Sequence, residues 1–111
     1  MYALFVILNQ TDKLDEILES LYELDTGATT LDSVGMGKVL LEHNVDEGLF
    51  SSITKILNEG KPYNKTLISV IRDKEVLDKA VNNIKGILNM KEKRAAGFMF
   101  VLPVLEIHEG L

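Results

Sequence analysis

The feature that most constrains the fold is an alternation of strand-like and helix-like apolar patterns along a chain of 111 residues. The first run, YALFVIL at residues 2–8, is apolar at every position and is typical of a buried strand. Apolar residues at helical spacing follow over about residues 12–25 and predict an amphipathic helix, with Gly27 as its left-handed stop. The chain therefore begins with a strand and a helix.

The same order returns after a less regular middle region. The segment ATTLDSVGMGKVLL, residues 28–41, is rich in β-branched residues and predicts a second strand that runs into a turn at its two glycines. Residues 49–57 carry apolar side chains at helical spacing and predict a short extra helix. The run TLISVI, residues 66–71, predicts the third strand, and Asp73 starts the most regular helical stripe in the chain.

The last element, AGFMFVLPVLEIH at residues 96–108, reads as an uninterrupted strand with Pro103 inside it. Since proline has no N–H to give to a ladder, this strand is expected at a sheet edge. The order of the elements predicts an α+β, ferredoxin-like βαββαβ fold. We expect a single domain over residues 1–111, with a four-stranded antiparallel sheet, two long helices on one face and the short extra helix between strands two and three.

The last strand is apolar on both of its faces, and two helices can cover only one face of a sheet. Large apolar side chains alternate along it: Phe98, Phe100, Leu102 and Val104 point to one face, and Met99, Val101, Pro103 and Leu105 to the other. Because a soluble monomer rarely exposes such a face, we expect the helix-free face to be buried against other subunits. The alternative is that the extra helix folds back over this face within one chain.

Composition narrows the classes of function. The formal net charge of -5 argues against a general nucleic-acid or anionic-membrane surface. The chain has no cysteine, which excludes disulfides and thiolate chemistry. The apolar run at residues 2–8 is too short for a membrane span and lacks the basic flank of a signal peptide. The expectation is a cytoplasmic protein that binds no nucleic acid and does not span a membrane.

Three segments resemble the PII signal-transduction superfamily, the nitrogen-regulatory trimers with a ferredoxin-like subunit. GATTLDSVGMG, residues 27–37, is similar to the family's second strand, which ends in glycine-x-glycine before the large T-loop. LISVIRDKEVLDKAVNNIKGIL, residues 67–88, is similar to the third strand and second helix. GFMFVLPV, residues 97–104, is similar to the signature strand, in which a glycine precedes an apolar run ending in Pro-Val. The resemblance covers most of the chain apart from residues 40–65.

This resemblance implies a homotrimer that binds an adenine nucleotide in clefts between subunits and signals to a partner protein, here through residues 40–60. One wall of such a cleft would be the base of the T-loop, and the other would be the loop before the last strand. Glycines there let backbone N–H groups approach an anion, and basic side chains supply positive charge. Transferred to this sequence, the cofactor-binding residues would be Thr29, Gly35, Met36 and Gly37 on one wall and Lys91, Lys93, Arg94 and Gly97 on the other.

The sequence also departs from the family pattern. The loop before the last strand reads KRAAGF, with alanines in place of a glycine and an aspartate and with Phe98 where a lysine is usual. Val39 stands where the family's glutamine helps to hold magnesium and 2-oxoglutarate, which implies that this sensor chemistry is absent. The long T-loop with its modifiable tyrosine is replaced by the short helix expected at residues 49–57. The identity of the ligand, an adenine nucleotide or another small anion, stays open.

The sequence indicates neither a catalytic set nor a metal site. His43 and His108 are the only histidines, and no third histidine or cysteine stands at metal-ligand spacing. No nucleophile and base can be paired, so we expect no enzyme activity. Two alternatives to nucleotide sensing stay open. One is an oligomeric interaction module without a ligand, and the other is a metal-related protein like the CutA-type cation-tolerance proteins, which share the trimeric ferredoxin-like architecture.

Overall fold

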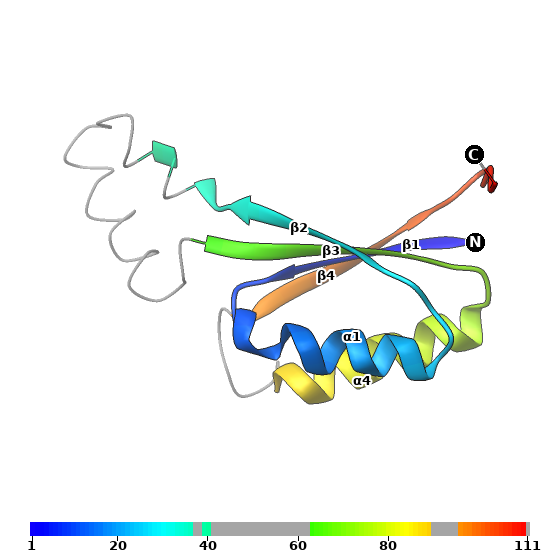
Figure 1. Ribbon diagram of the computed structural model, residues 1–111, viewed down its shortest axis with the longest axis horizontal. Helices are drawn as coiled ribbons and strands as arrows, with labels where there is room; N and C mark the ends of the chain where they lie inside the picture. The colour runs from blue at the N-terminus through cyan, green and yellow to red at the C-terminus, as the bar shows by residue number, and fades with distance from the viewer. Residues whose placement is uncertain (37–38, 41–62, 90–95, 111) are drawn as a thin grey trace.

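The computed structural model describes residues 1–36, 39–40, 63–89 and 96–110. These residues form an α+β fold with a four-stranded antiparallel sheet and two helices (Figure 1). In chain order the elements are β1 (Tyr2–Leu8), the 3-10 turn η1 (Thr11–Lys13), α1 (Leu14–Glu23), β2 (Thr29–Val34), β3 (Tyr63–Ile71), α4 (Lys74–Leu88) and β4 (Gly97–Pro103). This order is consistent with a ferredoxin-like fold. The extra helix expected at residues 49–57 lies outside the described residues.

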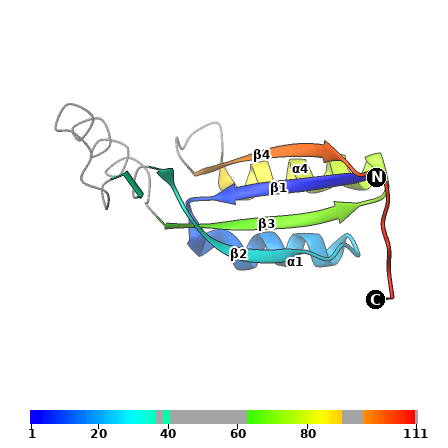
Figure 2. The same cartoon turned by 90° about the horizontal axis from the view of Figure 1, so that it is seen from above.

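The strands lie in the order β2-β3-β1-β4, so that β1 and β3 are central and β2 and β4 form the edges (Figure 2). All neighbouring pairs are antiparallel. Leu8, the last residue of β1, faces both Lys65 of β3 and Gly97 of β4. At the same end of the sheet, Val34 of β2 faces Tyr63 of β3. We call this end, where β1 and β2 finish and β3 and β4 begin, the Gly97 end of the sheet.

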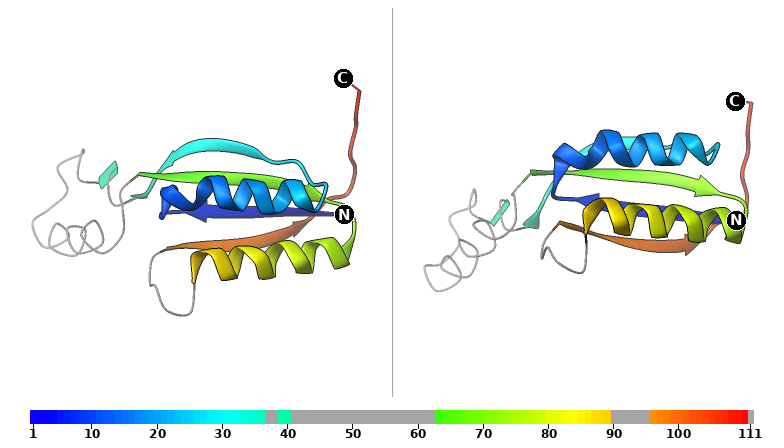
Figure 3. Two further views of the ribbon diagram at one scale, coloured as in Figure 1. Left: turned by 60° about the horizontal axis from the view of Figure 1, so that its bottom comes forward. Right: turned by 90° about the horizontal axis from the view of Figure 1, so that it is seen from below.

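The hydrophobic core lies between the sheet and the two helices, which pack on the same face of the sheet (Figure 3). Every second residue of the central strands points into this layer and meets the apolar stripes of α1 and α4. Among the described residues, no helix is long and apolar enough to cross a membrane. The buried core consists of Leu4, Val6, Leu8, Ile17, Leu21, Leu67, Ile71, Leu77, Ala80, Ile84, Leu88 and Ala96. Because burial of each large apolar side chain contributes roughly 1.5–3 kcal/mol, this layer is the main source of stability.

The end of α1 differs from the sequence prediction. Asp25, with a φ of 57°, takes the left-handed position, whereas Gly27 is not among the residues with positive φ. The N–H of Asp25 donates to the carbonyl of Tyr22 at 2.9 Å, and the N–H of Thr26 donates to the carbonyl of Leu21 at 3.0 Å. These two bonds form a Schellman motif, which closes the helix two residues earlier than Gly27 would. The prediction that Gly27 stops this helix is therefore wrong.

The other helix begins where the sequence predicts. Asp73 precedes α4 with extended backbone angles, and its carbonyl accepts the first intrahelical bond from Leu77 at 3.0 Å. Asn89 ends the helix in the left-handed conformation, with a φ of 49°. Strand β3, in contrast, begins at Tyr63 instead of residue 66, because Val34 of β2 extends the pairing to that residue.

Candidate functional site

The structure places four of the eight expected cofactor-binding residues, and they fall on both edges of the sheet. Thr29 is the first residue of β2, and Gly35 and Met36 follow directly after its last residue. Gly97 is the first residue of β4. The remaining four, Gly37, Lys91, Lys93 and Arg94, lie outside the described residues.

Gly35, Met36 and Gly97 share one end of the sheet but not one edge. Because β3 and β1 lie between β2 and β4, the two edges are three strand spacings apart, or about 14 Å. Thr29 faces Ile68 in the middle of β3, and the six residue steps from Thr29 to Gly35 span about 20 Å. One chain therefore does not bring these residues together, and a cleft that uses both edges requires a second copy of the chain.

A packing requirement explains the glycine at position 97. A Cβ atom there would lie 2.5 Å from the carbonyl oxygen of Ile7 in β1, which is closer than real side chains approach. The carbonyl of Ala96 accepts hydrogen bonds from the N–H groups of Asn9 and Gln10 at 2.9 and 3.0 Å. These contacts hold the start of β4 against the end of β1, so Gly97 has a structural role independent of any ligand.

An open groove of about 670 Å³ lies at the Gly97 end, along β2 and β3. Its lining residues are Thr11, Asp32, Ser33, Val34, Tyr63, Asn64 and Lys65. Within it, the ammonium group of Lys65 pairs across the strands with the carboxylate of Asp32. This exposed pair leaves the groove close to neutral, with one cation that a bound anion would share with Asp32.

The sequence patterns did not point to this groove, because they start the third strand at residue 66 and leave Tyr63 and Lys65 outside it. A usable signal is present in the sequence. Tyr63 and Lys65 continue, in steps of two, the series formed by Leu67, Ser69 and Ile71 on the helix side of β3. Extending that alternation backwards would have placed both side chains on the strand and beside the groove.

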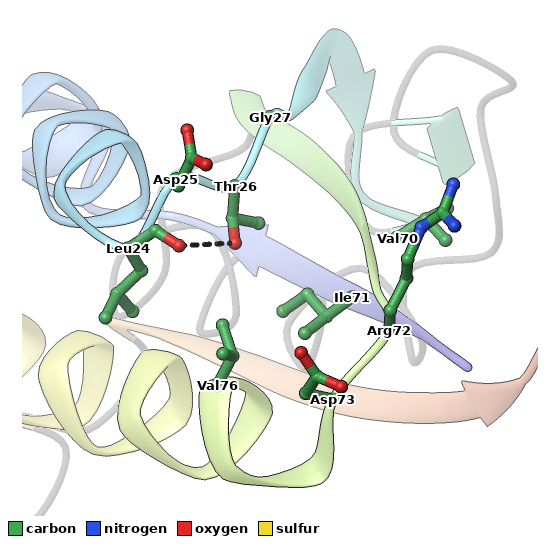
Figure 4. A pocket seen from close by; sticks show the side chains of 9 residues that line it. All are labelled: Leu24, Asp25, Thr26, Gly27, Val70, Ile71, Arg72, Asp73 and Val76. Atoms are coloured by element: carbon green, nitrogen blue, oxygen red, sulfur yellow. Dashed lines mark hydrogen bonds between the residues drawn. The ribbon is translucent and has the colours of Figure 1, made fainter.

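A second, smaller pocket of about 270 Å³ lies at the opposite end of the sheet (Figure 4). It is bounded by the exit of α1, the end of β3 and the start of α4, and is lined by Leu24, Asp25, Thr26, Gly27, Val70, Ile71, Arg72, Asp73 and Val76. The guanidinium of Arg72 pairs with Glu109. Beside the pocket, Lys74 donates a 2.6 Å hydrogen bond to Asp78, which raises the pKa of Lys74. Both cations are thus already paired with carboxylates, which makes this pocket a weak candidate for binding an anion.

The histidines do not define a metal centre in the part of the chain that the structure describes. There, no group of three or more His, Cys, Asp or Glu residues could hold a metal ion. The Nε2 atom of His108 lies 2.9 Å from a carboxylate oxygen of Glu106, and both side chains are exposed. His43 lies outside the described residues.

The face of the sheet opposite the helices, which we call the open face, is covered by neither α1 nor α4 (Figure 3). Directly paired residues point to the same face, so the register assigns to it the strand residues that alternate with the core. Its apolar members are Ala3, Phe5, Ile7, Leu31, Ile68, Val70, Phe98, Phe100 and Leu102. The other positions are Thr29, Ser33, Asn64 and Thr66. The described strands therefore place no charged residue on the open face.

Aromatic rings dominate the β4 side of the open face. The rings of Phe5 and Phe100 are stacked, with centroids 4.9 Å apart and planes 5° apart, and Phe98 lies 6.2 Å from Phe100. Despite this stacking, the side chain of Phe98 is 55% exposed, and Leu102 on the same strand is 47% exposed. Near the β2 edge polar side chains surround Leu31, and Ser33 Oγ lies 2.8 Å from Thr66 Oγ1.

No protein-family model matches the chain, and no curated protein matches it either.

Proposed function

We propose that the chain is a cytoplasmic, non-enzymatic regulatory protein of PII-like type with a ferredoxin-like subunit. In this proposal three copies assemble through their open faces. They bind an adenine nucleotide or another small anion between subunits, and residues 40–60 carry the signal to a partner protein.

The observation that carries this proposal is the uncovered, uncharged open face. Nine apolar side chains lie on it, and α1 and α4 cover only the other face. Contiguous apolar patches on soluble proteins commonly mark interaction sites, because their burial removes apolar area from water. A second copy of the same chain offers an equally apolar and uncharged surface to cover it.

The absence of charge on the described part of the open face favours a protein partner over a nucleic acid. Aromatic side chains on a four-stranded sheet can stack bases, but such platforms combine the rings with basic side chains that neutralise phosphates. The rings of Phe5, Phe98 and Phe100 have no basic neighbour among the open-face positions. The formal charge of -5 also disfavours association with phosphates.

The positions of the expected ligand residues support a site between subunits. Gly35 and Met36 lie at one edge of the sheet and Gly97 at the other, about 14 Å away within one chain. Assembly that brings the β2 edge of one copy near the β4 edge of another would put these residues into a common cleft. The groove with Lys65 and Asp32 opens at the same end and adds a cation to that cleft.

A thermal-shift screen with AMP, ADP, ATP, cyclic nucleotides, inorganic phosphate and divalent metal ions tests which ligand the protein binds. A ligand that binds only the folded protein raises the melting temperature, and a concentration of 100 times Kd contributes about 2.7 kcal/mol. We expect Arg94→Ala to reduce the shift, whereas Lys79→Ala, an exposed residue of α4 beside Glu75, should leave it unchanged. No shift with any of these compounds would favour the oligomeric module without a ligand, and a shift with divalent metal alone would favour the CutA-like alternative.

A further inference from the structure

The residues after β4 form an extended C-terminal arm, residues 104–110, which crosses the end of the sheet opposite the Gly97 end. The arm leaves β4 beside the N-terminus and runs crosswise to the strands (Figure 2). It rises on the side of the sheet away from the helices, which is the side of the open face (Figure 1).

Contacts near both ends of the arm hold it in this position. At its start, the N–H of Val104 donates a 3.1 Å hydrogen bond to the carbonyl of Met1. Near its far end, Glu109 pairs with the guanidinium of Arg72, the residue that follows β3. The arm is therefore guided across the ends of the central strands.

Of the two apolar side chains between these contacts, Leu105 points into solvent and Ile107 is partly buried. Leu105 is 91% exposed, the highest value among the exposed large apolar residues that the structure describes. Its polar neighbours Glu106, His108 and Glu109 are exposed as well, whereas the apolar Val104 and Ile107 are partly buried, so Leu105 is the fully exposed apolar side chain of the arm. A single exposed leucine is ordinary. A leucine held outward by contacts on either side of it, next to an uncovered apolar sheet face, is suited to docking.

We propose that the C-terminal arm docks on a second copy of this chain, with Leu105 as its apolar anchor. This inference rests on the proposed assembly through the open face. Because the arm rises on the same side as that face, a copy seated on the face meets the arm at its border. The arm then extends the apolar contact beyond the strands, and the exposed carboxylates of Glu106 and Glu109 fit the polar rim of an interface.

The test compares Leu105→Ser with Glu106→Ser, two variants of adjacent exposed residues. Sedimentation velocity over a range of protein concentrations measures the association of each variant and of the unchanged protein. We expect Leu105→Ser to weaken association roughly tenfold or more, as for loss of a buried leucine, and Glu106→Ser to change it less than about twofold. Neither side chain lies in the core, so far-UV circular dichroism should show the same fold for all three proteins.

The outcomes separate this inference from the proposed function. If the unchanged protein is oligomeric and Leu105→Ser associates equally well, the arm does not dock on a second copy, although the assembly itself stands. The same conclusion follows if both serine variants weaken association equally, because the effect would not be specific to the apolar side chain. If the unchanged protein is monomeric, both the arm contact and the proposed assembly are wrong.

Discussion

Replacement of Phe100 by alanine is the sharpest perturbation of the open face. Phe100 stacks on Phe5 at 4.9 Å and is still 39% exposed in one chain. A fully exposed phenylalanine has a surface of about 200 Å², so the exposed 39% of Phe100 is about 80 Å². At ~25 cal/mol per Å², burial of this area contributes about 2 kcal/mol per subunit. A loss of that size weakens each subunit contact roughly 30-fold.

The matched control for this experiment is Val101→Ala. Val101 is the next residue of β4 and is 40% exposed, almost the same as Phe100, but it points to the helix side of the sheet. Sedimentation equilibrium should show Phe100→Ala dissociating at concentrations where Val101→Ala and the unchanged protein remain assembled. Equal association of all three assembled proteins would refute the assignment of the open face as the subunit interface.

Two further predictions concern the backbone, each measured by urea unfolding of the isolated variant. Gly97→Ala should lower the free energy of unfolding by about 1–3 kcal/mol, because the new Cβ would approach the Ile7 carbonyl oxygen. The control is Gly27→Ala, whose Cβ meets no atom within 4 Å. It should change the free energy of unfolding by less than about 0.5 kcal/mol. Equal effects of the two would contradict the close approach of β4 to β1. Asp25→Gly should raise the free energy of unfolding by about 0.5–1 kcal/mol, because glycine has no Cβ atom to clash with the backbone at a φ of 57°. A clear loss of stability would mean that the Asp25 side chain has another role.

The sequence predicts the central strands and the helices well because their apolar periodicity is regular. β1 was expected at residues 2–8 and has those bounds, and Asp73 was expected to start the helix that begins at Lys74. The α+β class follows from this order of elements. The open face is also foreseeable, since Phe98, Phe100 and Leu102 alternate with Met99 and Val101 along one strand.

The differences arise where a local signal competes with longer-range contacts. A glycine is the usual left-handed stop, but the two closing bonds of α1 fall at Asp25 and Thr26, so Gly27 belongs to the connection toward β2. The early start of β3 depends on pairing with β2, which no window of β3 alone reveals. The groove beside Lys65 was missed for the same reason, because strand pairing places its walls together.

For the expected cofactor-binding residues, the sequence predicts the residue types but not how they are brought together. Their types suit an anion, but of those that the structure describes, Gly35 and Met36 follow one edge strand and Gly97 begins the other, so one chain does not bring these three together. A ligand cleft built from both edges exists only if copies associate. The ligand proposal therefore depends on the assembly proposal, and the assembly should be measured first.

The proposed assembly is tested most directly by the mass of the protein in solution, measured by light scattering at micromolar concentration. The proposed assembly predicts a trimer of about 37 kDa, three times the 12.4 kDa of one chain. A stable species of 12.4 kDa would contradict it, because the open face of the sheet would then remain uncovered in solution.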